Sequence, residues 1–328
     1  RLPNHGAGDT NDEDDIYVAV MGGGYGVNQP GLGSNLLVIN LDNGKLLKQI
    51  DIADLQGNGA DISGQGIINS VPSTPVVITA DTSTAINFRG ALVYVNDLEG
   101  KITKINLSNM EDDGNESATP TPISLYDQTT LFTAGSTSQN NRYMFHSMDA
   151  TIGNQGHDFW LFAGTGNYTN LNDAGVADKN AVDNLLIGIK DKTYPKFRKV
   201  DATGINGLTE CNDTTNDSSG ANCPEDADLG WYIKLDPSTT SARKKVTAEP
   251  TVSRGVVYFP IYKPNDVNIC NLGDAFICAA DDECGTNRSS ELGTTTASDP
   301  CLHVGNGALS KIVVFGNHVY ANIAGETT

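Results

Sequence analysis

Six cysteines carry the most distinctive chemistry of this sequence: Cys211, Cys223, Cys270, Cys278, Cys284 and Cys301. None of them forms a Cys-x-x-Cys pair, which disfavours zinc knuckles, redox motifs and c-type haem attachment. Most lie in polar stretches, and an even number of cysteines in such loops indicates disulfides formed in an oxidising compartment. Cys211 and Cys223 are predicted to form a local bridge, and the remaining four then allow three pairings.

A second group of residues that could bind a ligand is acidic and lies near the start of the chain. Oxygen ligands alternate at Asp9, Asn11, Glu13 and Asp15, as they do at the start of a calcium-binding loop. The central glycine and the final glutamate of such a loop are missing. We therefore favour a solvated acidic terminus, with calcium binding as the alternative.

The sequence offers no catalytic constellation. Two of the five histidines have an acidic residue nearby, His146 with Asp149 and His157 with Asp158. A metal or acid–base role would need a third partner, so structural hydrogen bonds are expected instead. There is no Gly-x-Ser-x-Gly elbow, and the glycine-rich run 22–26 lacks the Gly-Lys-Ser/Thr ending of a phosphate loop, which favours a close-packed strand end. The sequence therefore predicts no catalytic residue, no cofactor-binding residue and a protein that is not an enzyme.

The composition excludes further classes of function. The net charge of −19 comes from 40 acidic and 21 basic residues, and a field of this sign repels nucleic acid. No apolar stretch approaches the ~20 residues of a transmembrane helix. The 35 glycines suit short strands and tight turns better than long helices.

The elements that must position these residues are predicted to be strands. The apolar runs are short, rich in β-branched residues and separated by turns such as Asp42–Lys45, Leu98–Lys101 and Gly316–Asn317. The runs are Ile16–Met21, Leu36–Leu41, Val76–Thr79, Ala91–Val95, Ile102–Leu107, Phe159–Ala163, Leu185–Ile189, Val256–Tyr262, Ile312–Phe315 and His318–Ile323. The sequence therefore predicts an all-β protein with little helix.

A loose internal repeat narrows the architecture. A strand near a proline, a turn and then a Val-Tyr strand recur at Val71–Val95, Ala248–Phe259 and, more weakly, Gly307–Ala321. Repeated antiparallel units predict the blades of a β-propeller, with a sandwich as the alternative. Roughly fifteen strands, at about four strands per blade, predict about four blades or more. The chain is therefore either part of a propeller or contains further blades that the sequence pattern does not reveal. The segments Ser108–Gln128 and Asp201–Gly230 are interpreted as polar loop excursions.

Several runs also resemble a known family when they are taken in order. They are Ile16–Gly26, Leu37–Lys45, Pro72–Val77, Val93–Lys101, Leu131–Ala134, Phe162–Tyr168, Gly230–Tyr232, Pro250–Val252 and Val257–Phe259. Their order and spacing over most of the chain resemble the C-terminal β-propeller domain of PilC/PilY-family type IV pilus proteins. The resemblance implies that residues 1–328 are one such domain or part of it, and that the parent protein's N-terminal region is absent.

The resemblance also implies a function. Members of the family act in pilus assembly, retraction control and adhesion, which implies export through the periplasm to the cell surface or pilus. The implied partners are pilin subunits or minor pilins and a host or environmental surface. The family often holds calcium in a propeller loop, and the corresponding stretch here has Asp81 as its single acidic residue. The alternatives are a quinoprotein-like dehydrogenase, which the two tryptophans disfavour, and a structural component of an extracellular filament.

Overall fold

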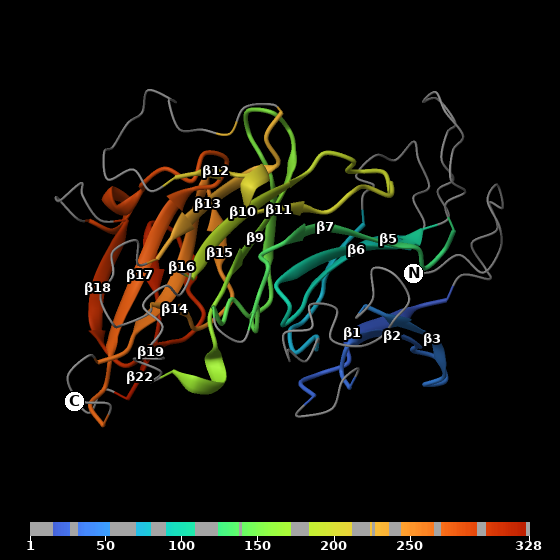
Figure 1. Ribbon diagram of the computed structural model, residues 1–328, viewed down its shortest axis with the longest axis horizontal. Coiled ribbons are helices and arrows are strands. Elements are labelled where there is room, and N and C mark those ends of the chain that lie inside the picture. The colour runs from blue at the N-terminus through green and yellow to red at the C-terminus, as the bar shows by residue number, and fades with distance from the viewer. Residues whose placement is uncertain are drawn as a thin grey trace. The chain divides into compact units, whose positions relative to one another are not determined.

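The computed structural model describes residues 16–26, 32–52, 70–79, 90–108, 124–137, 140–171, 184–211, 224, 227–235, 244–265, 270–293 and 300–325. These residues form 22 β-strands and three short 3-10 helices, which confirms the all-β prediction (Figure 1). Among them, no helix has the length and apolar character needed to cross a membrane. The chain divides into two compact units, Arg1–Thr133 with Thr193–Ala202, and Ala134–Lys192 with Thr203–Thr328.

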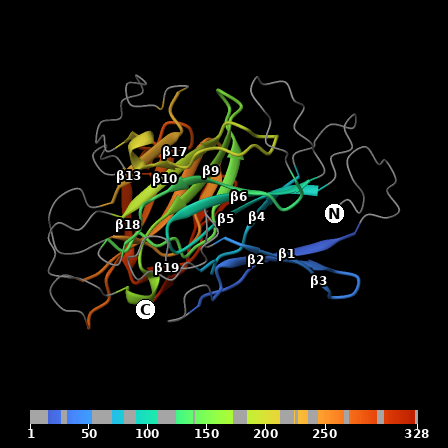
Figure 2. The same ribbon diagram turned by 45° about the vertical axis from the view of Figure 1, so that its right-hand side comes forward.

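The first unit contains two antiparallel sheets, which Figure 2 shows most clearly. One sheet has the order β1-β2-β3, with β1 at Val18–Gly22, β2 at Asn35–Asn40 and β3 at Leu46–Asp51. The other places β4, β5, β6 and β7 side by side. Their bounds are β4 Val76–Ile78, β5 Gly90–Asn96, β6 Lys101–Ser108 and β7 Gln128–Thr133.

An apolar core holds these two sheets together. Strand β2 alternates, with Leu36 and Val38 buried and the residues between them partly exposed. Strands β5 and β6 are buried at every position, as continuous apolar strands covered on both faces should be. The buried cluster contains Leu36, Val38, Ile50, Ile52, Val71, Val93, Val95, Ile105 and Leu107.

The turn between β5 and β6 is buried although it carries three charged residues. Asp97 Oδ1 accepts a hydrogen bond from the Lys101 N–H at 3.1 Å, and Gly100, with φ of 72°, supplies the left-handed conformation that the turn requires. The Lys101 ammonium lies 3.4 Å from Asp97 Oδ2 and 3.1 Å from Glu99 Oε2. Burial raises the pKa of Asp97 to about 6, although Lys101 acts to lower it.

The second unit contains two larger sheets and two small ones. One has the order β12-β13-β10-β9-β8, and the next joins β14 and β15 to β16, followed by β17 and β18. The small sheets pair β19 with β22 and β20 with β21. The bounds are β8 Asp149–Ile152, β9 Phe159–Gly164, β10 Leu185–Asp191, β11 Thr203–Gly204, β12 Thr209–Glu210, β13 Gly230–Lys234, β14 Lys245–Val246, β15 Thr251–Ser253, β16 Val256–Lys263, β17 Asp274–Asp281, β18 Cys301–Asn306, β19 Ala308–Leu309, β20 Val313–Phe315, β21 His318–Tyr320 and β22 Ile323–Ala324, with the 3-10 helices η1 Tyr168–Asn170, η2 Ile205–Gly207 and η3 Ser289–Leu292.

Large aromatic side chains fill the core between the two larger sheets. Trp160, Phe162 and Trp231 follow one another at ring-centroid distances of 6.4 and 6.1 Å. Trp231 then meets Phe259 of the next sheet edge-to-face at 6.5 Å. Both tryptophans are buried, so they serve as core residues rather than as a surface on which a cofactor could dock.

The internal repeat predicted from the sequence is visible in the strand registers, with one correction to its weaker third copy. There the Val-Tyr strand pairs with β20, whereas β19, predicted as its first strand, pairs with β22. In three hairpins a Val-Tyr strand pairs antiparallel with the strand before it. The matching pairs are Val77 with Val93, Val252 with Val257 and Val314 with Val319. Tyr94, Tyr258 and Tyr320 occupy the next position in each hairpin. The repeat is therefore a structural unit and not a coincidence of composition.

The structure confirms the strands predicted from apolar runs and adds others. Strands β3 and β8 were missed because charged or polar residues interrupt their apolar character. The segment Asp201–Gly230 is not wholly a loop excursion, since it contains β11, η2 and β12. The glycine-rich run 22–26 is a closely packed strand end, as predicted. A Cβ on Gly22 would lie 2.6 Å from the Val71 carbonyl oxygen.

Candidate functional site

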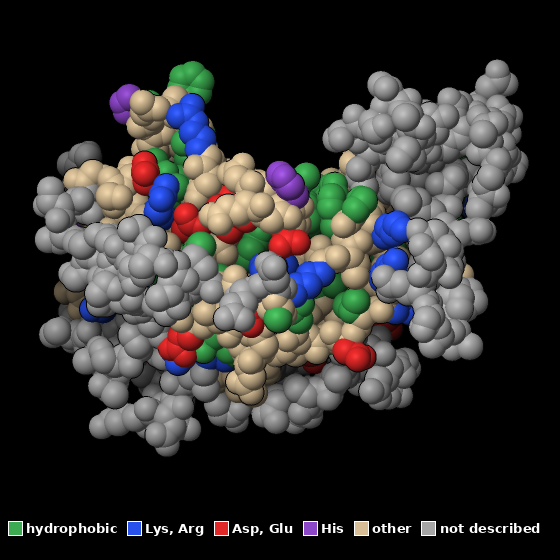
Figure 3. Space-filling view, turned by 90° about the horizontal axis from the view of Figure 1, so that it is seen from above, with side chains coloured by type: hydrophobic (Ala, Val, Ile, Leu, Met, Phe, Trp, Pro, Cys, Tyr) green, Lys and Arg blue, Asp and Glu red, His purple; other side chains and the backbone are tan. Residues whose placement is uncertain are grey.

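Several turns of the second unit lie on one face, which we call the turn face. It comprises the β8–β9 turn (153–158), the β15–β16 turn (254–255), the turn after β17 (281–286) and the β20–β21 turn (316–317). The view of Figure 3 is from the side where β10 ends and β13 begins in Figure 1. Acidic and basic side chains are interspersed there, without a large region of one sign.

A carboxylate joins two of these turns. Glu283 Oε1 accepts hydrogen bonds from the backbone N–H groups of Asn154 at 2.7 Å and Gln155 at 2.9 Å. Glu283 is held in place because Asp281 Oδ1 accepts the N–H groups of Glu283 and Cys284 at 3.1 and 3.0 Å. Consecutive backbone donors around a carboxylate form a rigid connection, so this part of the turn face is preorganised.

Arg254 joins the next pair of turns. The Asp282 N–H donates to the Gly255 carbonyl at 3.1 Å, which fixes the β15–β16 turn against the turn after β17. Arg254 and Gly255 both have positive φ, 53° and 81°, as the two central residues of a type I′ hairpin turn do. From this turn the Arg254 guanidinium donates to Asn317 Oδ1 at 3.0 Å.

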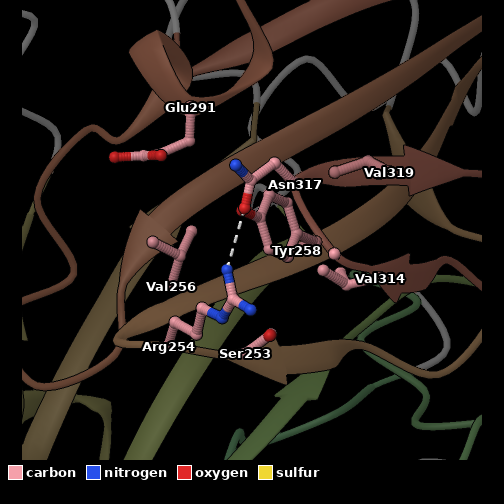
Figure 4. Close-up of a pocket in the computed structure, with 9 residues that line it drawn as sticks. Ser253, Arg254, Val256, Tyr258, Glu291, Val314, Asn317 and Val319 are labelled. Carbon is pink, nitrogen blue, oxygen red and sulfur yellow. Dashed lines mark hydrogen bonds between the residues drawn. The ribbon is translucent and has the colours of Figure 1, made fainter.

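A small cavity opens beside Arg254 (Figure 4). Its volume is about 130 Å³, and apolar and polar side chains share its wall. Figure 4 shows the Arg254 side chain extending between Val256 and Val314 toward Asn317. The Glu291 carboxylate points away from Arg254. The lining residues are Ser253, Arg254, Val256, Tyr258, Glu291, Val314, Gly316, Asn317 and Val319.

Charges near the cavity are partly neutralised. Arg288 lies 3.6 Å from Glu291 and 3.9 Å from Asp281. Burial raises the pKa of Tyr258, and Glu291 raises it further, whereas Arg288 acts to lower it. Burial, followed by the charges of Asp281 and Glu283, raises the pKa of Asp282 to about 6. The acidic residues of the turn after β17 therefore repel one another at neutral pH.

The cysteines stand partly as predicted. Cys278 and Cys301 face each other in β17 and β18 and form a disulfide, and Cys284 is also disulfide-bonded. Cys278 and Cys301 lie in strands, which corrects their assignment to polar loops. Cys211 is a buried thiol whose Sγ lies 3.0 Å from the Cys284 carbonyl oxygen, and burial raises its pKa to about 12. The predicted bridge from Cys211 to Cys223 is therefore wrong, and Cys223 lies outside the described residues. Cys270 is exposed.

Next to Cys211, a polar cluster joins β12 to β13. The Tyr232 hydroxyl donates to Glu210 Oε2 at 2.6 Å, and the Lys234 ammonium lies 2.8 Å from Glu210 Oε1. These two hydrogen bonds lower the pKa of Glu210, while burial and Glu210 raise the pKa of Tyr232 to about 12. With its carboxylate ionised and its phenol protonated, this cluster is structural.

The candidate metal ligands lie outside the described residues. They are Asp9, Asn11, Glu13, Asp15 and Asp81, so calcium binding there stays a prediction. Within the described ranges, no group of three or more His, Cys, Asp or Glu side chains is placed to hold a metal ion.

In the two candidate acid–base pairs, His146 with Asp149 and His157 with Asp158, both aspartates make structural contacts. Asp149 Oδ2 accepts the Val252 N–H at 2.8 Å, and the Asp158 carboxylate lies 4.0 Å from the Lys190 ammonium. Burial lowers the pKa of His146 to about 4. His157 has a φ of 56° in the β8–β9 turn.

Sequence reasoning missed Glu283, Arg254 and Asn317. Each lies in a turn, and its importance depends on a second turn that is distant in sequence. The available signal was the β15–β16 turn itself, where an arginine takes a position that usually favours Asn, Asp or Gly.

The structure was compared with known proteins. No protein-family model and no curated protein matches the chain. Among solved structures, the chain is similar to the crystal structure of the Pseudomonas aeruginosa PilY1 C-terminal domain, with a TM-score of 0.57 and 15% identity over 94% of this chain and 68% of that one. The PilY1 C-terminal domain is a β-propeller, so the chain has the β-propeller fold that its sequence predicted.

Proposed function

We propose that this chain is part of a type IV pilus system and acts there as a binding module. The observation that carries the proposal is the similarity of its fold, over 94% of the chain, to the PilY1 C-terminal domain. The ordered PilC/PilY-like runs of the sequence support the same assignment. Assembly, retraction control and adhesion are the roles that we propose within that system.

The turn face supports a binding role. Its turns are joined by the Glu283 carboxylate and the Arg254 guanidinium rather than held as separate loops. A surface whose side chains are already fixed loses less conformational entropy when a partner binds. The same scaffold leaves Asn154, Arg254 and Asn317 exposed and therefore available to a partner.

The remaining parts of the proposal follow from this role. The partners would be pilin subunits or minor pilins and an environmental or host surface. The protein would be exported and pilus-associated, where the Cys278–Cys301 disulfide can form. It would not be an enzyme, and calcium at Asp81 or the Asp9–Asp15 stretch would be its single cofactor.

Deletion of the gene in the producing bacterium tests the function. We expect fewer surface pili by electron microscopy and weaker attachment, both restored by the wild-type gene. Immunogold labelling should place the protein on pili or at their base. Normal piliation and attachment in the deletion strain would contradict the proposal. Dye reduction by the purified protein with pyrroloquinoline quinone and an alcohol would favour an enzyme instead.

A further inference from the structure

The cavity beside Arg254 has the features of an anchoring site for a peptide. We infer that it binds a peptide segment presenting one aliphatic side chain next to a carboxylate, the side chain entering the cavity and the carboxylate meeting Arg254. The inference deepens the proposed binding function and rests on it.

Arg254 has donor capacity that the fold does not use. Its one hydrogen bond within the described residues goes to Asn317, and it forms no ion pair with them. A guanidinium carries five N–H donors in a planar fork that matches a carboxylate. Tyr258, in the cavity wall, likewise makes no side-chain hydrogen bond to the described residues.

The backbone holds Arg254 in a costly conformation. Its φ of 53° lies in the left-handed region, where a side chain with a Cβ is disfavoured. The first position of the β20–β21 turn is Gly316, which also has a positive φ, 61°, and which as glycine adopts it without this cost. Strain retained at an exposed turn points to a function for the side chain.

The size and lining of the cavity define what enters it. Pockets for drug-sized ligands measure roughly 300–1,000 Å³, whereas a cavity of ~150 Å³ holds one benzene. About 130 Å³ therefore accommodates one aliphatic side chain of a larger molecule. Val256, Val314 and Val319 supply apolar contacts for it. A peptide can place such a side chain and a carboxylate within the span of one or two residues.

The charges nearby favour a single carboxylate over a phosphate. Glu291 lines the same cavity and is 3.6 Å from Arg288, so the local excess of positive charge is small. One guanidinium can bind a monoanionic carboxylate through two parallel hydrogen bonds. A dianion would gain no second cation, because Arg288 is paired with Glu291.

Peptide titration tests the inference. The probes are acetyl-Gly-Ser-Val with a free carboxylate, the same peptide as its amide, and acetyl-Gly-Val-Asp-amide, followed by ligand-observed NMR. We expect one or both carboxylate peptides to bind about tenfold or more tightly than the neutral amide. The pair distinguishes a terminal from a side-chain carboxylate. Equal binding of all three, or binding of none, would overturn the inference.

Two variants and a control locate the site. Arg254→Gly suits the turn and should abolish the preference for carboxylate, while the protein remains folded with only a small change in melting temperature. Val319→Met should fill the cavity and weaken every probe. Lys311→Gln removes an exposed cation that is paired with Glu249 elsewhere in the unit, and should leave binding unchanged. Unchanged carboxylate preference in Arg254→Gly would refute the assignment.

The two proposals can fail separately. If the peptides do not bind but the gene deletion impairs pili, the inference about the cavity is wrong and the pilus function stands. If the peptides bind through Arg254 but the deletion strain is normal, the site stands and the pilus function is wrong.

Discussion

The β4–β5 and β20–β21 hairpins have the same register and differ in what covers them. Val76 pairs with Tyr94 in the first, and Val313 pairs with Tyr320 in the second. Tyr94 is 0% exposed, whereas Tyr320 is 53% exposed. Strand β5 has a further neighbour, β6, while β21 pairs with β20 alone among the described strands. The repeat thus specifies strand pairing, and a third strand decides burial.

The largest effect should come from truncating the buried tyrosine. Tyr94→Ala removes a ring that also lies 5.9 Å from the Lys104 ammonium, and should cost about 3–5 kcal/mol. Tyr320→Ala is the matched control and should change stability by about 0.5 kcal/mol or less. Urea unfolding of both variants measures the difference, and equal losses would refute the comparison.

The free energy of unfolding should depend on pH through Asp97, in the buried turn that follows β5. The pKa of Asp97 is about 6 in the folded state and 3.8 ordinarily, so the folded protein binds the proton more tightly. The unfolding free energy should therefore fall as pH rises from about 4 to 6, by on the order of 2–3 kcal/mol. Asp97→Asn should remove this decrease. Denaturant unfolding across that range measures it, and an identical profile in the variant would exclude Asp97 as its source.

The exposed face of the β20–β21 hairpin should tolerate polar residues. Phe315 is 78% exposed, so Phe315→Ser should change the free energy of unfolding by about 0.5 kcal/mol or less. Because it shrinks an exposed apolar patch, it should also reduce self-association, measured by analytical ultracentrifugation. A marked loss of stability would mean that Phe315 is covered in solution.

Two further variants should separate the turn residues that have a positive φ, Gly316 and Arg254. Gly316 has no neighbouring atom within 4 Å of a built Cβ, so Gly316→Ala should cost only what a side chain loses at positive φ, about 1 kcal/mol or more. Arg254→Gly should relieve that cost but gain unfolded-state entropy, leaving a net change within about 1 kcal/mol. Thermal unfolding of both variants measures the contrast. A large loss in Arg254→Gly would indicate a structural role for the arginine.

Much of the fold could be predicted from residue patterns. The Val-Tyr repeat predicted hairpins because pairing is local and side chains alternate across a strand. Strand β3, with Lys48 and Gln49, was missed because its edge position tolerates polar residues. The pairing of Cys278 with Cys301 could not be predicted, since it depends on the register of β17 against β18.

The site was harder to predict than the fold. Arg254 and Asn317 lie 63 residues apart, and their contact exists because two hairpin turns lie side by side. Glu283 reaches Asn154 across 129 residues for the same reason. Each residue taken alone is an ordinary polar residue in a turn, so sequence spacing gives no signal of the arrangement.

The Cys278–Cys301 disulfide has a consequence for how the chain responds to proteolysis. It closes a covalent ring that contains Glu283, Arg288 and Glu291. A protease that cut the chain once within this ring would leave both fragments attached. A single cut there would therefore leave the turn after β17 covalently attached to the rest of the chain, and the cut would become visible on a gel only after a reductant was added.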